Sequence, residues 1–89
     1  MDQAATTGTV TILYFAQFRE EAGTSRETVR IPPDRRATAE TLFDQVCSAH
    51  GFSLGKSVVR PAINGAYARW NDPVQPDDEL VFIPPVAGG

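Results

Sequence analysis

The sequence predicts an α+β fold in which one main helix packs across a mixed sheet of four or five strands. Residues 39–50 have the apolar periodicity of an amphipathic helix, and residues 9–15 and 80–83 have the composition of buried strands. The Asn64-Gly65 pair is the strongest hairpin signal in the chain, because both residues accept a positive φ. A helix lying over such a sheet would bury the apolar surfaces of both.

Length and composition are those of one domain, with 89 residues in the chain. The net charge of −3 disfavours nucleic acid as a partner, since nucleic-acid binding favours a basic stripe. The single cysteine, Cys47, cannot make an internal disulfide. No apolar run approaches the ~20 residues that span a membrane, and no signal-like leader opens the chain. We therefore expect a cytoplasmic protein that binds neither nucleic acid nor membrane, with a flexible leader at residues 1–8 and a domain at residues 9–83.

The first third of the chain predicts two strands joined by a short helix. Residues 9–16 form a strand well inside a sheet, because both faces become apolar toward its end; one face carries Val10, Ile12 and Tyr14. Residues 16–22 are good helix formers that stop at Gly23, which gives one or two helical turns with Phe18 pointing inward. Residues 25–31 predict an exposed strand beside the first, closed by a diproline and followed by a loop.

The main helix has clear start and stop signals. Thr38 is the expected N-cap, Glu40 lies in the first turn where the helix dipole favours an acid, and Gly51 follows the last turn. The apolar face is formed by Ala39, Leu42, Phe43, Val46 and His50. Cys47 beside this face is interpreted as a packed side chain rather than a reactive thiol, because no basic residue is near it in the sequence. His50 is interpreted as a cation at the helix C-terminus rather than a catalytic group.

The second half of the chain predicts a hairpin and a final strand. Residues 57–63 form a modest strand near an edge of the sheet, since Pro61 interrupts the run. A type I′ turn leads into a return strand at residues 66–70, and Asn- and Asp-containing turns separate this strand from the last one. Residues 80–83 are expected to pair in parallel with the first strand, in the middle of the sheet. This arrangement is a β-grasp, the ubiquitin-like roll.

The segment after the last strand, residues 84–89, predicts an extended arm. Pro84 and Pro85 end the sheet pairing and hold the chain extended. The side chains then shrink from valine through alanine to Gly88 and Gly89, so that the end can enter a slot too narrow for a Cβ atom. The chemically distinctive group of this arm is the terminal carboxylate of Gly89.

Searches for catalytic patterns in the sequence find little. The chain has no glycine-rich phosphate loop, no pair of cysteines at metal-ligand spacing and no Ser-His-Asp set. The acidic run Asp77-Asp78-Glu79 is interpreted as a solvated turn, because consecutive side chains point in different directions. We therefore expect a protein that is not catalytic alone and that binds no cofactor or metal by itself.

Three stretches of the chain carry recognisable motifs. They are Ile12-Leu13-Tyr14-Phe15-Ala16-Gln17-Phe18-Arg19-Glu20, Ala62-Ile63-Asn64-Gly65, and the ending Asp77-Asp78-Glu79-Leu80-Val81-Phe82-Ile83-Pro84-Pro85-Val86-Ala87-Gly88-Gly89. With the spacing between them, they cover nearly the whole chain after the leader. In these motifs the chain resembles the small sulfur-carrier proteins of the MoaD/ThiS type, most closely the small subunits of molybdopterin synthase. The ending from Phe82 onward is the specific part of the resemblance.

The resemblance implies that Gly89 is the reacting residue. An ATP-using, E1-like adenylyltransferase (MoeB-like) would adenylate its carboxylate, and a sulfur donor would convert the acyl-adenylate to a thiocarboxylate. The large synthase subunit (MoaE-like) would take in the tail within a heterotetramer, where the sulfur passes to a pterin precursor. Partner contacts are then expected from apolar residues around the last strand and from the tail: Phe82, Pro84, Pro85, Val86, Ala87 and Gly88. For Phe82, burial in the core is the alternative.

Other functions share the same terminus. The chain could carry sulfur for thiamine, cysteine or tRNA thiolation, although the diproline before Val-Ala-Gly-Gly favours the molybdopterin branch. It could also be a ubiquitin-like modifier that is joined through Gly89 to a lysine of a target. A binding module with an idle tail is the third alternative, because chain ends often carry no function.

Overall fold

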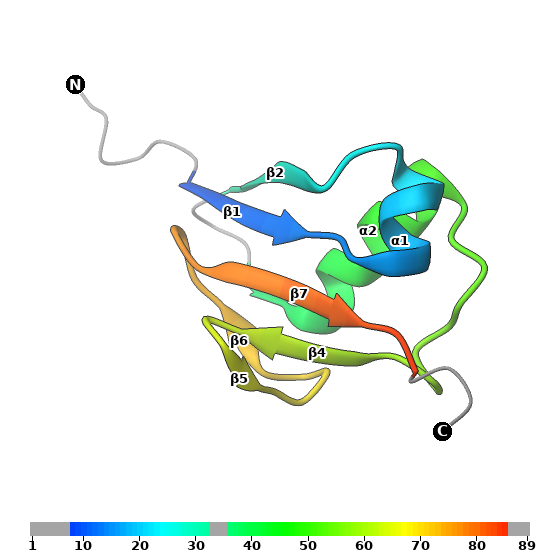
Figure 1. The fold of residues 1–89 in the computed structure, drawn as a ribbon. Helices are drawn as coiled ribbons and strands as arrows, with labels where there is room; N and C mark the ends of the chain where they lie inside the picture. Colours follow the sequence, from blue (N-terminus) through cyan, green and yellow to red (C-terminus); the bar gives the residue numbers. More distant parts are fainter. Residues whose placement is uncertain (1–7, 33–35, 86–89) are drawn as a thin grey trace.

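The computed structural model describes residues 8–32 and 36–85 (Figure 1). Along the chain the elements are β1 (Gly8–Leu13), α1 (Ala16–Ala22), β2 (Arg26–Ile31), β3 (Ala37–Thr38), α2 (Ala39–His50), β4 (Arg60–Ile63), β5 (Ala66–Tyr67), β6 (Pro73–Val74) and β7 (Glu79–Ile83). Five strands form one sheet in the order β2-β1-β7-β4-β5, and β3 pairs with β6. The predicted α+β fold is confirmed.

Strand β7 occupies the centre of the five-stranded sheet. It runs parallel to β1, with Ile12 opposite Leu80, and antiparallel to β4, with Ile63 opposite Leu80. The other pairs, β1 with β2 and β4 with β5, are antiparallel. The predicted parallel pairing in the middle of the sheet is therefore confirmed, and with α2 across the sheet this topology is a β-grasp.

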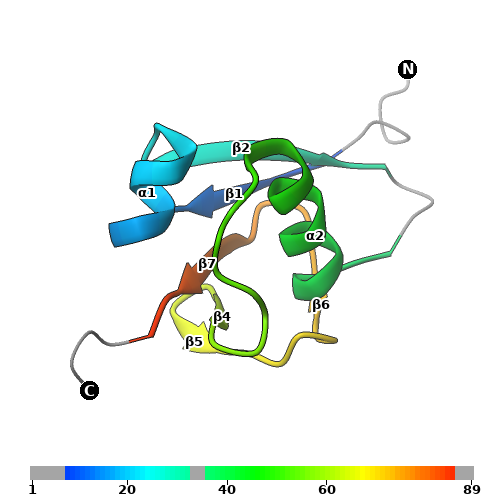
Figure 2. The same cartoon turned by 90° about the vertical axis from the view of Figure 1, so that its right-hand side faces the viewer.

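Helix α2 covers one face of the sheet (Figure 2). Between them lies an aromatic core in which the Phe43 ring centroid is 4.8 Å from that of Phe82, and the Phe18 ring meets both edge-on. Such edge-to-face contacts add to the hydrophobic stabilisation of buried rings. The side of the five-stranded sheet that is turned away from α2 is called the open face below.

Capping fixes both ends of α2. The Thr38 side chain accepts a hydrogen bond from the Thr41 N–H (3.2 Å), and the Thr41 hydroxyl accepts one from the Thr38 N–H (2.9 Å). This capping box satisfies two of the backbone donors that a helix start leaves unpaired. At the other end Gly51 has φ +70°, and its N–H donates to the Cys47 carbonyl at 2.7 Å. Both predicted boundaries are confirmed.

Strand β1 differs from its prediction at both ends and on one face. It begins at Gly8, which we had assigned to the leader, and ends at Leu13. Tyr14 is buried, but the side chain of Phe15 is 51% exposed. The predicted position inside the sheet is confirmed, since β1 lies between β2 and β7, but α2 covers only the face that holds Val10 and Ile12.

The second half contains shorter strands than predicted. Strand β4 starts at Arg60 rather than at residue 57, and β5 ends at Tyr67. The expected return strand up to residue 70 is wrong because Trp70 turns inward, with its ring centroid 5.1 Å from that of Phe43. The pairing of β3 with β6 was missed, since strands of two residues carry no alternation signal.

Candidate functional site

Alternate side chains of β7 lie on opposite faces of the sheet. Leu80 and Phe82 are fully buried, whereas Val81 and Ile83 are half-buried on the open face. Phe82 packs against Phe43, Phe18 and Trp70 in the core. The assignment of Phe82 to partner binding is therefore wrong, because its side chain has no exposed surface to offer.

Apolar side chains line up across the open face beside the end of β7. Directly opposite residues of paired strands share a face, so the register Leu13–Val81–Ala62–Tyr67 forms one row. Ile83 lies one row nearer the tail, and Phe15 continues the alternation of β1 on the same side. We call this surface the apolar strip; its members are Leu13, Phe15, Ala62, Tyr67, Val81 and Ile83. Phe15 and Tyr67 are its most exposed members, at 51% and 66%.

Arginines flank the apolar strip on two strands. The Arg60 guanidinium carbon lies 4.6 Å from the centroid of the Tyr67 ring, a cation–π contact, and Arg60 is directly opposite Ile83. On the other side, Arg26 of β2 is opposite Leu13. This part of the open face is therefore apolar with a basic margin, although the whole chain carries a net charge of −3.

The predicted arm starts at the edge of the apolar strip. Strand β7 ends at Ile83; Pro84 is half-buried and Pro85 is exposed. A prolyl residue fixes φ near −65°, so the start of the arm is held in an extended form. Val86, Ala87, Gly88 and the predicted reacting residue Gly89 lie outside the described residues.

Helix α1, which follows Phe15, is tied to the loop after α2. The hydroxyl of Ser53 donates to one carboxylate oxygen of Glu21 at 2.6 Å, and the Ser53 N–H donates to the other at 3.0 Å. The side-chain amide of Gln17 donates one hydrogen bond to the Glu21 carboxylate and one to the Ser53 hydroxyl. The hydrogen bonds from Ser53 hold the pKa of Glu21 below its usual value. These contacts fix the position of α1 and thereby of Phe15 at its start.

A polar cluster links β1, β2 and the end of α2. The Tyr14 hydroxyl donates to Glu27 Oε1 at 2.6 Å, and His50 Nε2 lies 2.8 Å from the same oxygen. Burial first, and then the hydrogen bond to Glu27, raise the pKa of Tyr14, while the Tyr14 hydrogen bond lowers that of Glu27. His50 was predicted only as a cation at the C-terminus of α2. The structure shows in addition that it contacts Glu27 of β2.

Two further predictions concern Cys47 and the acidic turn. Cys47 is half-buried against the core, and burial raises the pKa of its thiol. Lys56, a basic residue nine positions further along the chain, lowers this pKa by a smaller amount.

The acidic run at residues 77–79 forms a turn. The carboxylate of Asp78 accepts hydrogen bonds from the Gln75 N–H and from the Asn64 side-chain amide. Within residues 8–32 and 36–85, no three His, Cys, Asp or Glu side chains are placed to hold a metal ion.

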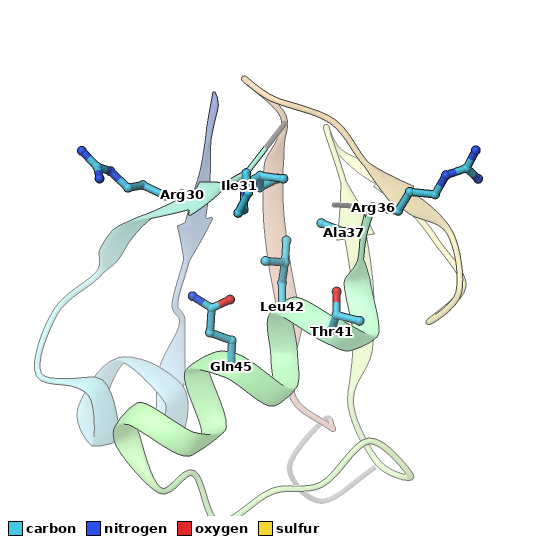
Figure 3. Close-up of a pocket in the computed structure, with 8 residues that line it drawn as sticks. Arg30, Ile31, Arg36, Ala37, Thr41, Leu42 and Gln45 are labelled. Carbon is cyan, nitrogen blue, oxygen red and sulfur yellow. The ribbon is translucent and has the colours of Figure 1, made fainter. Parts of the chain in front are cut away.

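A small cavity lies at the opposite end of the sheet from the arm. Its walls include Ile31, which pairs with Gly8 at the start of β1, and Leu42 of α2. The side chains of Arg30 and Arg36 point away from each other on either side of it (Figure 3). The two cations therefore do not converge on a common anion.

No helix in the described part of the chain is long and apolar enough to cross a membrane.

The sequence contains only part of the information that determines the apolar strip. Alternation in residues 79–83 places two apolar side chains on each face of β7, and the burial of the strand determines which pair faces the core. Phe15 lies within the motif of residues 12–20, and Tyr67 lies two residues after the motif of residues 62–65. The exposure of both side chains depends on which face of the sheet α2 covers. That information is not local to either residue.

Comparisons with known proteins agree with this architecture. The chain is similar to the molybdopterin synthase sulfur carrier subunits of Drosophila melanogaster (36% identical over 83 residues, 90% of each chain) and of Homo sapiens (31% over 84 residues, 90% and 93%). Among solved structures it is similar to SAMP1 from Haloferax volcanii, with 30% identity and a TM-score of 0.72, covering 92% of this chain and 100% of that one. The family model described as ThiS family matches residues 12–89. The match extends from the middle of β1 through the arm, and the chain therefore belongs to the ThiS family.

Proposed function

We propose that the chain is the sulfur carrier subunit of a molybdopterin synthase. The observation that carries this proposal is the position of β7, which lies at the centre of the sheet, ends at Ile83 beside the apolar strip and is followed by Pro84 and Pro85. The relatives in fly and human, which carry that name, match the chain over nine-tenths of its length. Residues 84–89 reach at most about 20 Å when extended, enough to enter a pocket of a partner.

The chemistry takes place at the terminal carboxylate of Gly89. With a pKa of about 3.3–3.7 this group is an anion at neutral pH and a poor electrophile. An E1-like adenylyltransferase (MoeB-like) transfers AMP to it from ATP: a carboxylate oxygen bonds to the α-phosphorus and pyrophosphate leaves. Hydrosulfide released by the sulfur donor then bonds to the carbonyl carbon, the bond from that carbon to the AMP oxygen breaks, AMP leaves, and Gly89 ends as a thiocarboxylate. We assign the acids, bases and phosphate-binding groups of these steps to the partners.

Sulfur delivery requires a second partner. We assign this role to a synthase large subunit (MoaE-like) that docks on the apolar strip and takes in the arm. Apolar centres with polar margins are typical of specific interfaces, and Arg60 and Arg26 supply such a margin here. The stiff diproline lowers the entropy lost on docking, because the start of the arm is already extended. The sulfur then passes to the pterin precursor; a location in the cytoplasm stays a prediction.

Intact mass spectrometry tests this function. The chain is incubated with the adenylyltransferase, ATP and a sulfur donor, and we expect the mass change of one oxygen replaced by one sulfur, localised to Gly89. Adding the large subunit and the pterin precursor should reverse that change. An unchanged mass under all conditions would contradict the proposal.

A protein modifier is the second candidate function. One observation favours it: SAMP1 of Haloferax volcanii, which has the same fold, is described as a small archaeal modifier protein. A modifier would be joined through Gly89 to lysines of other proteins; trypsin last cleaves this chain after Arg69, so it would leave residues 70–89 on the modified lysine, whereas a carrier would leave no such remnant. Peptide mapping of a cell extract for this remnant, alongside the intact mass, separates the two functions.

A further inference from the structure

Lys56 is the only lysine of the chain; the other seven of its eight cationic residues are arginines. This composition matters if Gly89 is adenylated, so the inference rests on the proposed function. An acyl-adenylate reacts with neutral amines, whereas a guanidinium group keeps its proton and is no nucleophile at neutral pH. Lys56 is therefore the only side-chain amine through which one activated copy could be joined to another.

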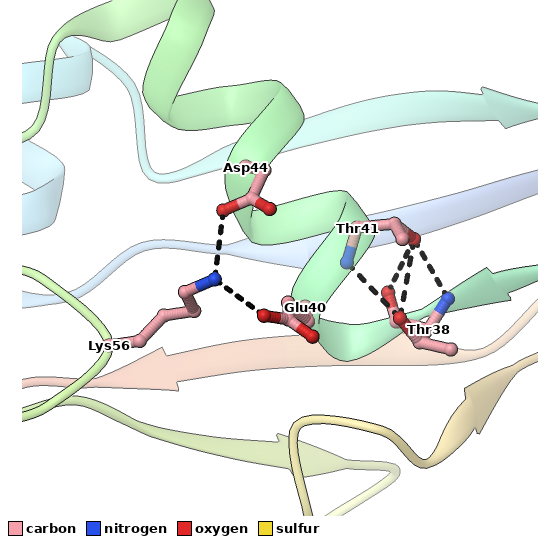
Figure 4. Close-up of polar contacts among 5 residues, drawn as sticks. All are labelled: Thr38, Glu40, Thr41, Asp44 and Lys56. Atoms are coloured by element: carbon pink, nitrogen blue, oxygen red, sulfur yellow. Dashed lines mark hydrogen bonds and ion pairs between the residues drawn. The ribbon is translucent and has the colours of Figure 1, made fainter.

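Two carboxylates hold the Lys56 amine. Its Nζ atom donates to Glu40 Oε2 at 2.6 Å and lies 3.3 Å from Asp44 Oδ1, between the two groups (Figure 4). Glu40 and Asp44 are one helical turn apart on α2, so they face the same side. Lys56 comes from the loop between α2 and β4 and folds back onto that side. Its side chain is 35% exposed, so its reactivity is not limited by burial.

The carboxylates act on the electronic state of the amine. An ammonium group has no lone pair, and both contacts favour the ammonium form. The hydrogen bond to Glu40 is the largest cause that raises the pKa of Lys56, and Asp44 acts in the same direction. At any pH below that pKa, the fraction of neutral amine is smaller than for an unpaired lysine.

We propose that Glu40 and Asp44 hold Lys56 back from acylation, so that the activated carboxyl terminus of one copy is not consumed by another copy. In the suppressed reaction, the Nζ lone pair bonds to the Gly89 carbonyl carbon, and the bond from that carbon to the AMP oxygen breaks. The amine proton passes to solvent, and no oxidation or reduction takes place. Suppression of this reaction leaves the acyl-adenylate for the sulfur donor.

A chemical acylation assay tests the proposal without any partner protein. Acetylation of Lys56 by limiting N-hydroxysuccinimidyl acetate is followed by peptide mass spectrometry for the wild type and the Glu40→Gln/Asp44→Asn double variant. We expect the double variant to react about two- to fivefold faster at pH 8, the effect of losing exposed ion pairs. Glu20→Gln on α1 is the matched control and should leave the rate unchanged.

The pH dependence of this rate separates the electronic effect from a steric one. If the carboxylates act by favouring the ammonium form, the rate–pH profile of the double variant shifts to lower pH and the two rates converge in strong alkali. Equal rates for the wild type and the double variant at pH 8 would overturn the proposal. So would a constant ratio of rates at every pH.

Self-conjugation is the second readout. With adenylyltransferase and ATP but no sulfur donor, we expect more adduct of two chains minus one water from the double variant than from the wild type. The Lys56→Arg variant should give no adduct at this residue. Failure to adenylate Gly89 would contradict the proposed function alone, because the acylation assay still decides the role of Glu40 and Asp44.

Discussion

Adjacent residues of β7 have opposite surroundings. Phe82 is fully buried among aromatic rings, and Ile83, the next residue, lies on the open face opposite Arg60. The two side chains are similar in hydrophobicity, so the sequence alone does not separate their roles. Their different burial leads to a matched pair of predictions.

Replacement of Phe82 by alanine should destabilise the fold. Removal of a buried ring leaves a cavity between α2 and the sheet, and we expect the free energy of unfolding to fall by about 3–5 kcal/mol. Urea denaturation followed by Trp70 fluorescence measures this loss. If Phe82→Ala unfolds the domain outright, Phe82→Leu gives the milder value; a stability equal to the wild type would contradict the burial of Phe82.

Replacement of Ile83 by serine should weaken binding instead. We expect the Kd for the large subunit to rise about tenfold or more, because central apolar contacts dominate interface energies. The free energy of unfolding should fall by only about 1 kcal/mol, since the side chain is half-buried. Calorimetry measures the Kd. Thr28→Ser, on the open face outside the apolar strip, is the control and should bind as the wild type does.

At the scale of elements, the cluster of Tyr14, Glu27 and His50 joins two strands to the end of α2. Glu27 belongs to β2, and its carboxylate contacts side chains that are 13 and 23 residues away along the chain. Because the cluster connects distant segments, its loss should loosen the contact of β2 with the helix. No local pattern in the sequence predicts a contact between residues so far apart along the chain.

The stability contributed by Glu27 should depend on pH. The folded state lowers the pKa of Glu27, so its contribution is complete above the ordinary value near 4.5 and is lost as the pH falls through the lowered pKa. We expect about 1 kcal/mol, a small value because a third of the side chain is exposed. The difference between wild-type and Glu27→Gln stability curves isolates this part from Glu21, which also titrates in this range. A difference that stays constant from neutral pH to strong acid would contradict the prediction.

Elements with their own end signals could be predicted from the sequence. Thr38 and Gly51 bound α2, and Asn64-Gly65 has the positive φ angles of the predicted hairpin turn. The apolar strip could not be predicted, because it depends on the register of β1, β7, β4 and β5 and on the face that α2 covers. For the same reason the sequence left Phe82 open between partner binding and the core, and it did not single out the exposed side chain of Tyr67. Short pairings such as β3 with β6 depend wholly on the tertiary fold.

At the scale of the whole molecule, the proposed function makes the domain the support of the arm. Five strands and α2 fix the end of β7, and the reacting group of the proposed function lies beyond it along the chain. Stability and activity should therefore be separable. The domain supports the arm, while the chemistry depends on the terminal carboxylate.

Deletion of Gly89, or addition of one residue after it, should abolish sulfur loading. The adenylyltransferase and the large subunit must both reach a carboxylate at one distance from β7, and either change moves it by about 3.3 Å. The thermal unfolding midpoint should stay unchanged, since no described core contact involves the arm. Intact mass measures the loading. An extended chain that still becomes a thiocarboxylate, with its extension uncleaved, would contradict this prediction.

The central position of β7 also affects how the protein folds during its synthesis. Thr11 pairs with Glu79, so β1 and β7 meet only after most of the chain has left the ribosome. Until then β1 and β4 lack the strand that joins them, and pairing over such long separations is slow. The sheet is thus completed only when β7, the last strand along the described part of the chain, has been synthesised. A chain that ends before residue 79 lacks both the central strand and the proposed reacting group, so it would offer the adenylyltransferase neither a complete sheet nor a carboxylate to activate.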